Sequence, residues 1–245
     1  MHKFLLFLIR VQWIDRLATS SFLMGITIQT VLLTGALYRA AENPEHALLL
    51  ATRSSMLTCT SIVLLSAMSN VQNEFRYGTI ERVLLGRVPF TRLLGVRSAA
   101  SAIVASPAIV VPFAGGAMRY PELIAPGTAV LVLMVYVFLG TLCFQSTLVL
   151  CQFRNSAAMV PWLRMALLFL GLSVIPFEGS ETVSLFFPTG WMLRFAEHGQ
   201  DAAPVFDFAA FLALVVVWTG GAWLVLRQRS LHIVERSLTD SSEAS

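Results

Sequence analysis

The sequence has little charge and almost no lysine. Of its 245 residues, 13% are charged and 56% are hydrophobic, whereas globular domains carry about 25% charged and about 45–50% apolar residues. So little charge does not cover the water-facing surface of a soluble domain, and so much apolar content excludes a disordered chain. Three cysteines are few and odd in number, which excludes a disulfide-stapled secreted scaffold. The composition therefore indicates an integral membrane protein.

Lysine occurs once, as Lys3, among 17 basic residues. The phosphate-binding loop of ATPases needs Gly-Lys followed by Ser or Thr, and the sequence has no such motif. The middles of the long apolar stretches contain no Asp, Glu or His, which argues against hydrolytic chemistry within a membrane. The histidines are scattered and the cysteines form no CxxC pair, so we expect no metal site and no cofactor bound by this chain.

Long apolar stretches recur along the chain, and a membrane-spanning helix needs about 20 such residues. We predict an all-α, polytopic membrane protein with six transmembrane helices, at residues 18–38, 54–73, 98–118, 126–150, 157–177 and 206–226. Arg53 and Arg164 lie in or near these spans, where they either snorkel to the interface or serve a function. Gln29 and Gln145 lie near mid-span, where they either line a substrate path or hydrogen-bond between helices.

The basic residues predict the orientation, because Lys and Arg concentrate in cytoplasmic loops. With both termini inside, 12 basic residues fall in inner segments and 3 in outer ones, which predicts an N-in/C-in topology. Residues 227–245 are then a cytoplasmic tail, expected to be frayed. Residues 1–16 are expected to form an interfacial helix with one wetter side. A signal peptide is the alternative, although no small-residue cleavage site follows.

The second inner loop, residues 72–97, is the most charged stretch and contains five of the 17 basic residues. From Ile80 onward, apolar residues recur at i, i+3 and i+4, which predicts a short amphipathic helix on the cytoplasmic side. Thr79 suits its N-cap and Pro89 its end. A second helix then begins near Thr91 and runs into the third span. On charge alone, an anchor to lipid is the favoured interpretation of such a loop.

The residue pattern of this loop resembles that of the same loop in ABC-2-type transporter permeases. The likeness rests on Glu74, the pair Gly78-Thr79, the pair Glu81-Arg82 and a Pro-Phe-Thr-Arg turn at 89–92, directly after the second span. It extends to the general plan of an N-terminal interfacial helix, six spans and no soluble domain. By architecture it covers most of the chain, and by motif it covers only the inner loop.

The resemblance implies the transmembrane subunit of an ATP-binding-cassette exporter in the bacterial inner membrane. Residues 74–92 would be the coupling loop that docks on a separate ATPase. The residues implied for coupling are Glu74, Gly78, Thr79, Glu81 and Arg82. The implied partners are ATPase subunits that hold ATP and Mg, a second permease subunit, identical or homologous, and membrane lipid, with no nucleic acid.

The implied activity is outward movement of a hydrophobic or amphipathic substrate, such as a drug, an antimicrobial peptide or a lipid-like molecule. The alternative is a non-transporting membrane scaffold or sensor whose basic loop binds a partner or anionic lipid. The two differ in whether ATP turnover is needed and in how steeply binding falls with salt.

The same resemblance implies a short helix between the fifth and sixth spans. Residues 184–196 are apolar but too short to span a bilayer. Pro188 and Gly190 are expected to break this segment, and Trp191 is of the type that anchors at the membrane interface. The segment either re-enters the membrane, buried in protein, or forms an outer loop that dips into the headgroups.

Overall fold

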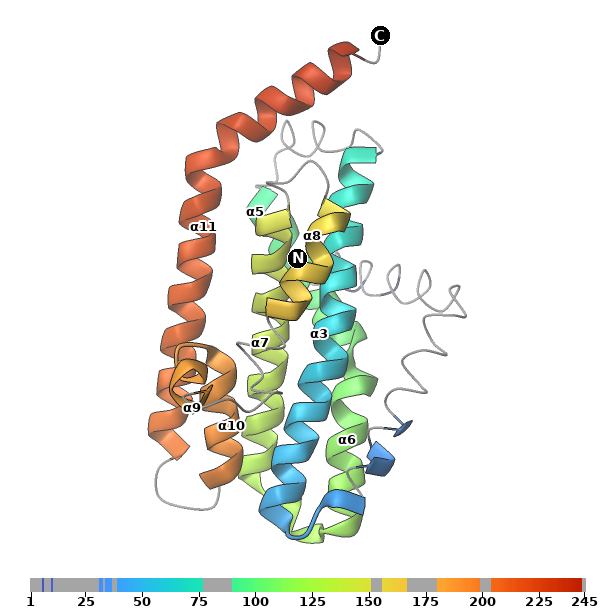
Figure 1. Cartoon of the computed structure of the whole chain (residues 1–245), viewed down its shortest axis with the longest axis vertical. Coiled ribbons are helices and arrows are strands. Elements are labelled where there is room, and N and C mark those ends of the chain that lie inside the picture. Colours follow the sequence, from blue (N-terminus) through green and yellow to red (C-terminus); the bar gives the residue numbers. More distant parts are fainter. Residues whose placement is uncertain are drawn as a thin grey trace.

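The computed structural model describes residues 6, 10, 31–32, 34–36, 39–76, 90–150, 156–166, 180–198 and 204–243. In these ranges the regular structure is helical throughout, with no strand. The elements are α3 (Pro44–Arg76), α5 (Phe90–Val104), α6 (Ser106–Arg119), the short 3-10 helix η1 (Pro121–Leu123), α7 (Pro126–Leu150), α8 (Ser156–Ala166), α9 (Ser180–Ser184), α10 (Pro188–His198) and α11 (Pro204–Glu243). Figure 1 shows an elongated bundle whose long helices run along one axis.

Four segments are long and apolar enough to cross a membrane, namely Pro44–Leu64, Leu94–Arg119, Pro126–Leu150 and Val205–Leu224. The all-α prediction is confirmed, and these apolar helices are those of a membrane protein. Outside the described residues lie most of the expected interfacial helix at 1–16, most of the first span at 18–38 and the second half of the fifth span at 157–177.

Helix α3 lies at the centre of the bundle. It contacts α5, α6, α7, α8 and α10, and 76% of its apolar window is buried, against 17% of the window in α11. Small hydroxyl residues let membrane helices approach closely, and here their hydroxyls bond to backbone. Thr52 Oγ1 donates to the Leu48 carbonyl at 2.8 Å, and Ser55 Oγ donates across to the Ile109 carbonyl of α6 at 3.3 Å.

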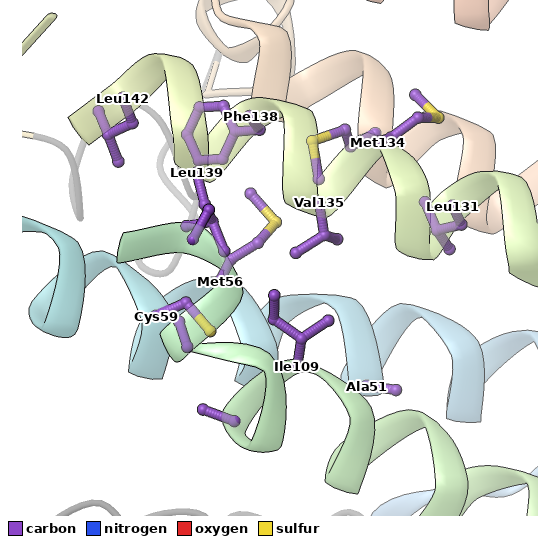
Figure 2. Close-up of a cluster of buried hydrophobic side chains, with 14 of the residues drawn as sticks. Ala51, Met56, Cys59, Ile109, Leu131, Met134, Val135, Phe138, Leu139 and Leu142 are labelled. Atoms are coloured by element: carbon purple, nitrogen blue, oxygen red, sulfur yellow. The ribbon is translucent and has the colours of Figure 1, made fainter. Parts of the chain in front are cut away.

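The core lies where α3, α6 and α7 meet (Figure 2). Met56 of α3, Ile109 of α6 and Leu139 of α7 are fully buried there. The buried side chains of α7 recur every three or four residues, so they form one stripe facing α3 although the helix is apolar on every side. Outside this stripe, Leu133 is 55% exposed, as suits a side chain that faces lipid.

The expected third span consists of two helices, α5 and α6, which join at Ala105. Pro107 has no N–H, and its ring crowds the carbonyl four residues earlier, that of Ile103. Ser106 Oγ donates a hydrogen bond to this same carbonyl. Ala105 itself has φ −77° and ψ −2°, so the chain bends without leaving the helical region. Both helices together still form one segment long enough to cross a membrane.

Other helix bounds agree with the sequence only in part. Helix α7 occupies the expected residues 126–150, and α5 begins at Phe90, close to the expected start near Thr91. Helix α3 begins at Pro44, before the expected 54–73, so Arg53 lies inside a helix and is exposed there. The described first half of the fifth span is α8.

The expectation of a frayed tail at 227–245 is wrong for most of its length, because α11 is helical as far as Glu243. This part of the sequence contains no Pro or Gly, so a helix already nucleated in the apolar segment propagates through it. Figure 1 shows it extending past the end of the bundle.

Leu131→Ala is expected to destabilise the bundle, whereas Leu133→Ala on the same helix is not. Leu131 is fully buried and Leu133 is 55% exposed. Truncating a leucine in a packed core costs about 2–5 kcal/mol. Thermal unfolding of the purified protein in a single detergent, followed by circular dichroism, measures both variants. Equal melting temperatures would contradict the burial of the Leu131 side of α7.

Candidate functional site at the turn between α9 and α10

Of the residues expected to couple to a partner, the structure describes Glu74, at one end of α3. Glu74 lies in the last turn of this helix, which ends at Arg76. The expected coupling loop at 74–92 therefore begins in α3 and ends in α5, which starts at Phe90. Outside the described residues lie Gln29, Gly78, Thr79, Glu81 and Arg82.

Gln145 connects α7 to α11. Its Nε2 donates a hydrogen bond to Oγ1 of Thr219 at 3.0 Å, and both side chains are half-buried. This contact corresponds to the interhelical role, one of the two that the sequence leaves open for Gln145. Such bonds between membrane helices contribute about 0.6 kcal/mol on average. Because α11 is the least buried of the four span-length helices, this bond helps to fix its position.

A tight turn at residues 185–187 joins α9 to α10. The N–H of Phe187 donates to the Ser184 carbonyl at 2.9 Å, and that of Gly190 donates to the Phe187 carbonyl at 3.1 Å. Pro188 is the first residue of α10, where a missing N–H is harmless and the fixed φ of proline suits the helix. The segment 184–196 is interrupted at 185–187, directly before Pro188, as expected, whereas the expectation that Gly190 also breaks it is wrong, because Gly190 lies inside α10.

Gly190 lets α9 and α10 approach each other closely. A Cβ at this position would overlap the backbone carbonyl of Ser184, at the end of α9. Gly190 lies in the first turn of α10, so it is the space around it, rather than an unusual backbone angle, that requires glycine. Any side chain there would push the end of α9 away from α10.

Two tryptophan side chains bind this turn from different helices. Trp191 of α10 donates from Nε1 to the Leu185 carbonyl at 2.9 Å, and Trp218 of α11 donates to the Phe186 carbonyl at 3.1 Å. The Trp218 ring also stacks on Phe187, with centroids 5.3 Å apart. The indole N–H groups thus satisfy carbonyls in a turn between two short helices, and the Trp218 hydrogen bond attaches the turn to α11.

Beside the turn, an ion pair joins α10 to the start of α11. Arg194 Nε lies 3.5 Å from Asp207 Oδ1. The Arg194 guanidinium carbon lies 5.3 Å from the centre of the Trp191 ring, and this ring meets Phe206 edge-to-face at 5.7 Å. The Asp207 side chain is 1% exposed and that of Arg194 is 46% exposed, so the anion is inside and the cation is at the rim.

The buried face of α10 packs into the bundle. Met192, Phe195 and Ala196 are almost fully buried, and α10 contacts α3, α7 and α11. In Figure 1, α9 and α10 lie beside α11 near the end of the bundle where α11 begins. Burial in protein is the condition that a non-spanning segment at membrane depth has to meet, and α10 meets it.

Sequence reasoning missed Arg194, Asp207 and Trp218 as members of this site. In the sequence, Arg194 lies between the expected fifth and sixth spans and Asp207 lies at the edge of the sixth, and only the fold brings them together. One signal was available, because Asp207 directly precedes an apolar run, where a carboxylate needs a partner. Within the described ranges, no three His, Cys, Asp or Glu side chains gather as metal ligands would.

Comparisons with known proteins provide no relative for this chain. No protein-family model, no curated protein and no solved structure matches it.

Gly190→Ala is expected to destabilise the protein, and Gly220→Ala in α11 is its matched control. The methyl group at 190 meets the Ser184 carbonyl, whereas no described atom lies within 4 Å of a Cβ at 220. Overpacking costs about 1–3 kcal/mol, while Gly to Ala inside an open helix adds up to about 1 kcal/mol of stability. Melting temperatures of the two variants test this. A Gly190→Ala protein as stable as the unchanged one would disprove the close contact of α9 and α10.

Proposed function

We propose that this chain is the transmembrane permease subunit of an ABC exporter, which couples ATP hydrolysis by separate ATPase subunits to outward movement of a substrate. The observation that carries the proposal is the short helix α10, whose buried face packs into the bundle beside the α9–α10 turn. The ABC-2-type permeases that the inner loop resembles have a short helix at this place, between the fifth and sixth spans. Four span-length apolar helices and a sequence without a phosphate loop also support it.

Helix α3 provides a mechanical route for such coupling. It is one helix of 33 residues, about 50 Å long at about 1.5 Å per residue. Its Glu74 end leads into the proposed coupling loop, its middle packs on α6 and α7, and it also contacts α10. Packed helices move as rigid bodies. A displacement of the loop by an ATPase would therefore reach α10 and the turn.

In this proposal ATP and Mg belong to the partner ATPase, and this chain binds no cofactor. A second permease subunit, identical or homologous, completes the transporter. The apolar spans with few charges favour a hydrophobic or amphipathic substrate. The proposed location is the bacterial inner membrane with both termini inside, and the arginine distribution and the resemblance of the inner loop support it.

Glu74→Ala is expected to weaken coupling to the ATPase, with Glu122→Ala as the control. Glu74 lies in the last turn of α3, whereas Glu122 is exposed in η1 at the other end of the bundle. Losing a charged partner at an interface lowers affinity about tenfold or more. The tagged chain is co-expressed with the ATPase subunits encoded beside it, and co-purification and ATP hydrolysis in proteoliposomes are measured. The double change of Gly78 and Thr79 to Ala should act as Glu74→Ala does.

Three outcomes would count against the proposal. A stably monomeric chain that no ATPase accompanies would overturn the exporter. If the variants at Glu74, Gly78 and Thr79 all couple to the ATPase as the unchanged chain does, these residues do not belong to the coupling surface. Binding to anionic vesicles that falls steeply with salt and does not depend on ATP would identify the scaffold or sensor instead.

A further inference from the structure

The carboxylate of Asp207 lacks most of the partners that a buried anion requires. It is 1% exposed, and among the described residues neither of its oxygens accepts a hydrogen bond. Removing a carboxylate from water costs several kcal/mol unless a cation and hydrogen bonds compensate. The compensation that the structure provides is Arg194, at 3.5 Å, which is longer than the roughly 2.7–2.9 Å of a charge-assisted hydrogen bond.

The two members of this ion pair differ in how easily they can leave it. Arg194 has a side chain that is 46% exposed and reaches Asp207 from the rim, so its guanidinium can turn outward without losing all its hydration. Asp207, in contrast, is fixed on the first turns of α11 and buried. The buried carboxylate of Asp207 therefore needs a cation beside it, but a cation other than Arg194 can fill that role.

Aromatic rings lie beside the Arg194–Asp207 ion pair. Trp191 presents its ring to the Arg194 guanidinium at 5.3 Å, and Phe206 meets the Trp191 ring at 5.7 Å. Phe206 is 65% exposed, so the aromatic pair reaches the surface of the bundle. Aromatic faces beside a carboxylate are the chemistry that binds organic cations such as quaternary ammonium groups. Arg194 occupies this place as a tethered cation would.

We propose that Asp207, Trp191 and Phe206 form a binding site for organic cations, which Arg194 fills until a substrate cation displaces it. The inference rests on the proposed exporter for its transport role, and it narrows the substrate class to amphipathic cations. When the substrate cation binds, the link between α10 and α11 through Arg194 opens. Binding thereby loosens the helix that carries the α9–α10 turn.

Tetraphenylphosphonium, a permanent and delocalised organic cation, tests the site on the purified chain alone in nanodiscs of zwitterionic lipid. Isothermal titration calorimetry measures its affinity for the unchanged chain and for Asp207→Asn, Arg194→Gln and Arg119→Gln. Triphenylphosphine oxide serves as the neutral analogue. Arg119 is the matched control, because it is exposed and its guanidinium also lies 5.3 Å from an aromatic ring, that of Tyr120.

We expect one variant to bind tetraphenylphosphonium more tightly than the unchanged chain and another to bind it more weakly. Arg194→Gln removes the competing cation and should tighten tetraphenylphosphonium binding about tenfold, while Asp207→Asn should weaken it about tenfold or more. Arg119→Gln should leave it unchanged, and the neutral analogue should not distinguish the variants. A gain of affinity does not arise from misfolding, so the Arg194→Gln result stands even where Asp207→Asn folds poorly.

Weaker or unchanged binding in Arg194→Gln would overturn the site and leave a purely structural ion pair, whose loss lowers the melting temperature of both variants. The assay contains no ATPase, so it is independent of the exporter proposal. A chain that shows the expected pattern but never accompanies an ATPase keeps the cation site and loses the exporter role. A chain that couples to an ATPase without this pattern keeps the exporter role and loses the site.

Discussion

Where a helix bends or stops, carbonyl groups lose their helical donors, and away from water each unsatisfied carbonyl costs several kcal/mol. At three such points a side chain supplies the missing donor: Ser106 beside Pro107, and Trp191 and Trp218 at the α9–α10 turn. These donors permit the two departures from straight helices, the bend between α5 and α6 and the insertion of two short helices. The site depends on the second departure, because only the turn brings α10 against the start of α11.

Sequence patterns predict α7 within its observed bounds, because residues 126–150 contain no charged residue and begin with proline, which favours the first turn of a helix. They miss the first part of α3, residues 44–53, where Glu45, His46 and Arg53 lower the hydropathy. The one hydroxyl in this part, that of Thr52, donates to the Leu48 carbonyl of the same helix. They also miss the helical extension of α11. Hydropathy indicates where lipid or core contact begins, whereas helix bounds depend on where backbone hydrogen bonding ends.

The site is predictable in composition but not in geometry. Pro188, Gly190 and Trp191 attract attention as residues of a short apolar segment, yet their roles depend on contacts that the sequence does not contain. Gly190 is needed because Ser184 lies against it, and this follows from the direction in which α9 leaves the turn. Trp218 reaches the turn from the middle of a different helix. Pairings of this kind depend on the angle between helices, which local periodicity does not determine.

The position of α10 connects the ion pair to the rest of the bundle. Helix α10 contacts α11 on one side, where Arg194 meets Asp207, and α3 on another. In the proposed site, a cation that replaces Arg194 would favour the arrangement in which α10 is released from α11. By thermodynamic linkage, the factor by which the cation favours release of α10 equals the factor by which release of α10 raises the affinity for the cation. A displacement of α3 that moves α10 away from α11 would therefore change that affinity. An exporter needs such reciprocity, because its substrate site has to bind in one arrangement and release in the other.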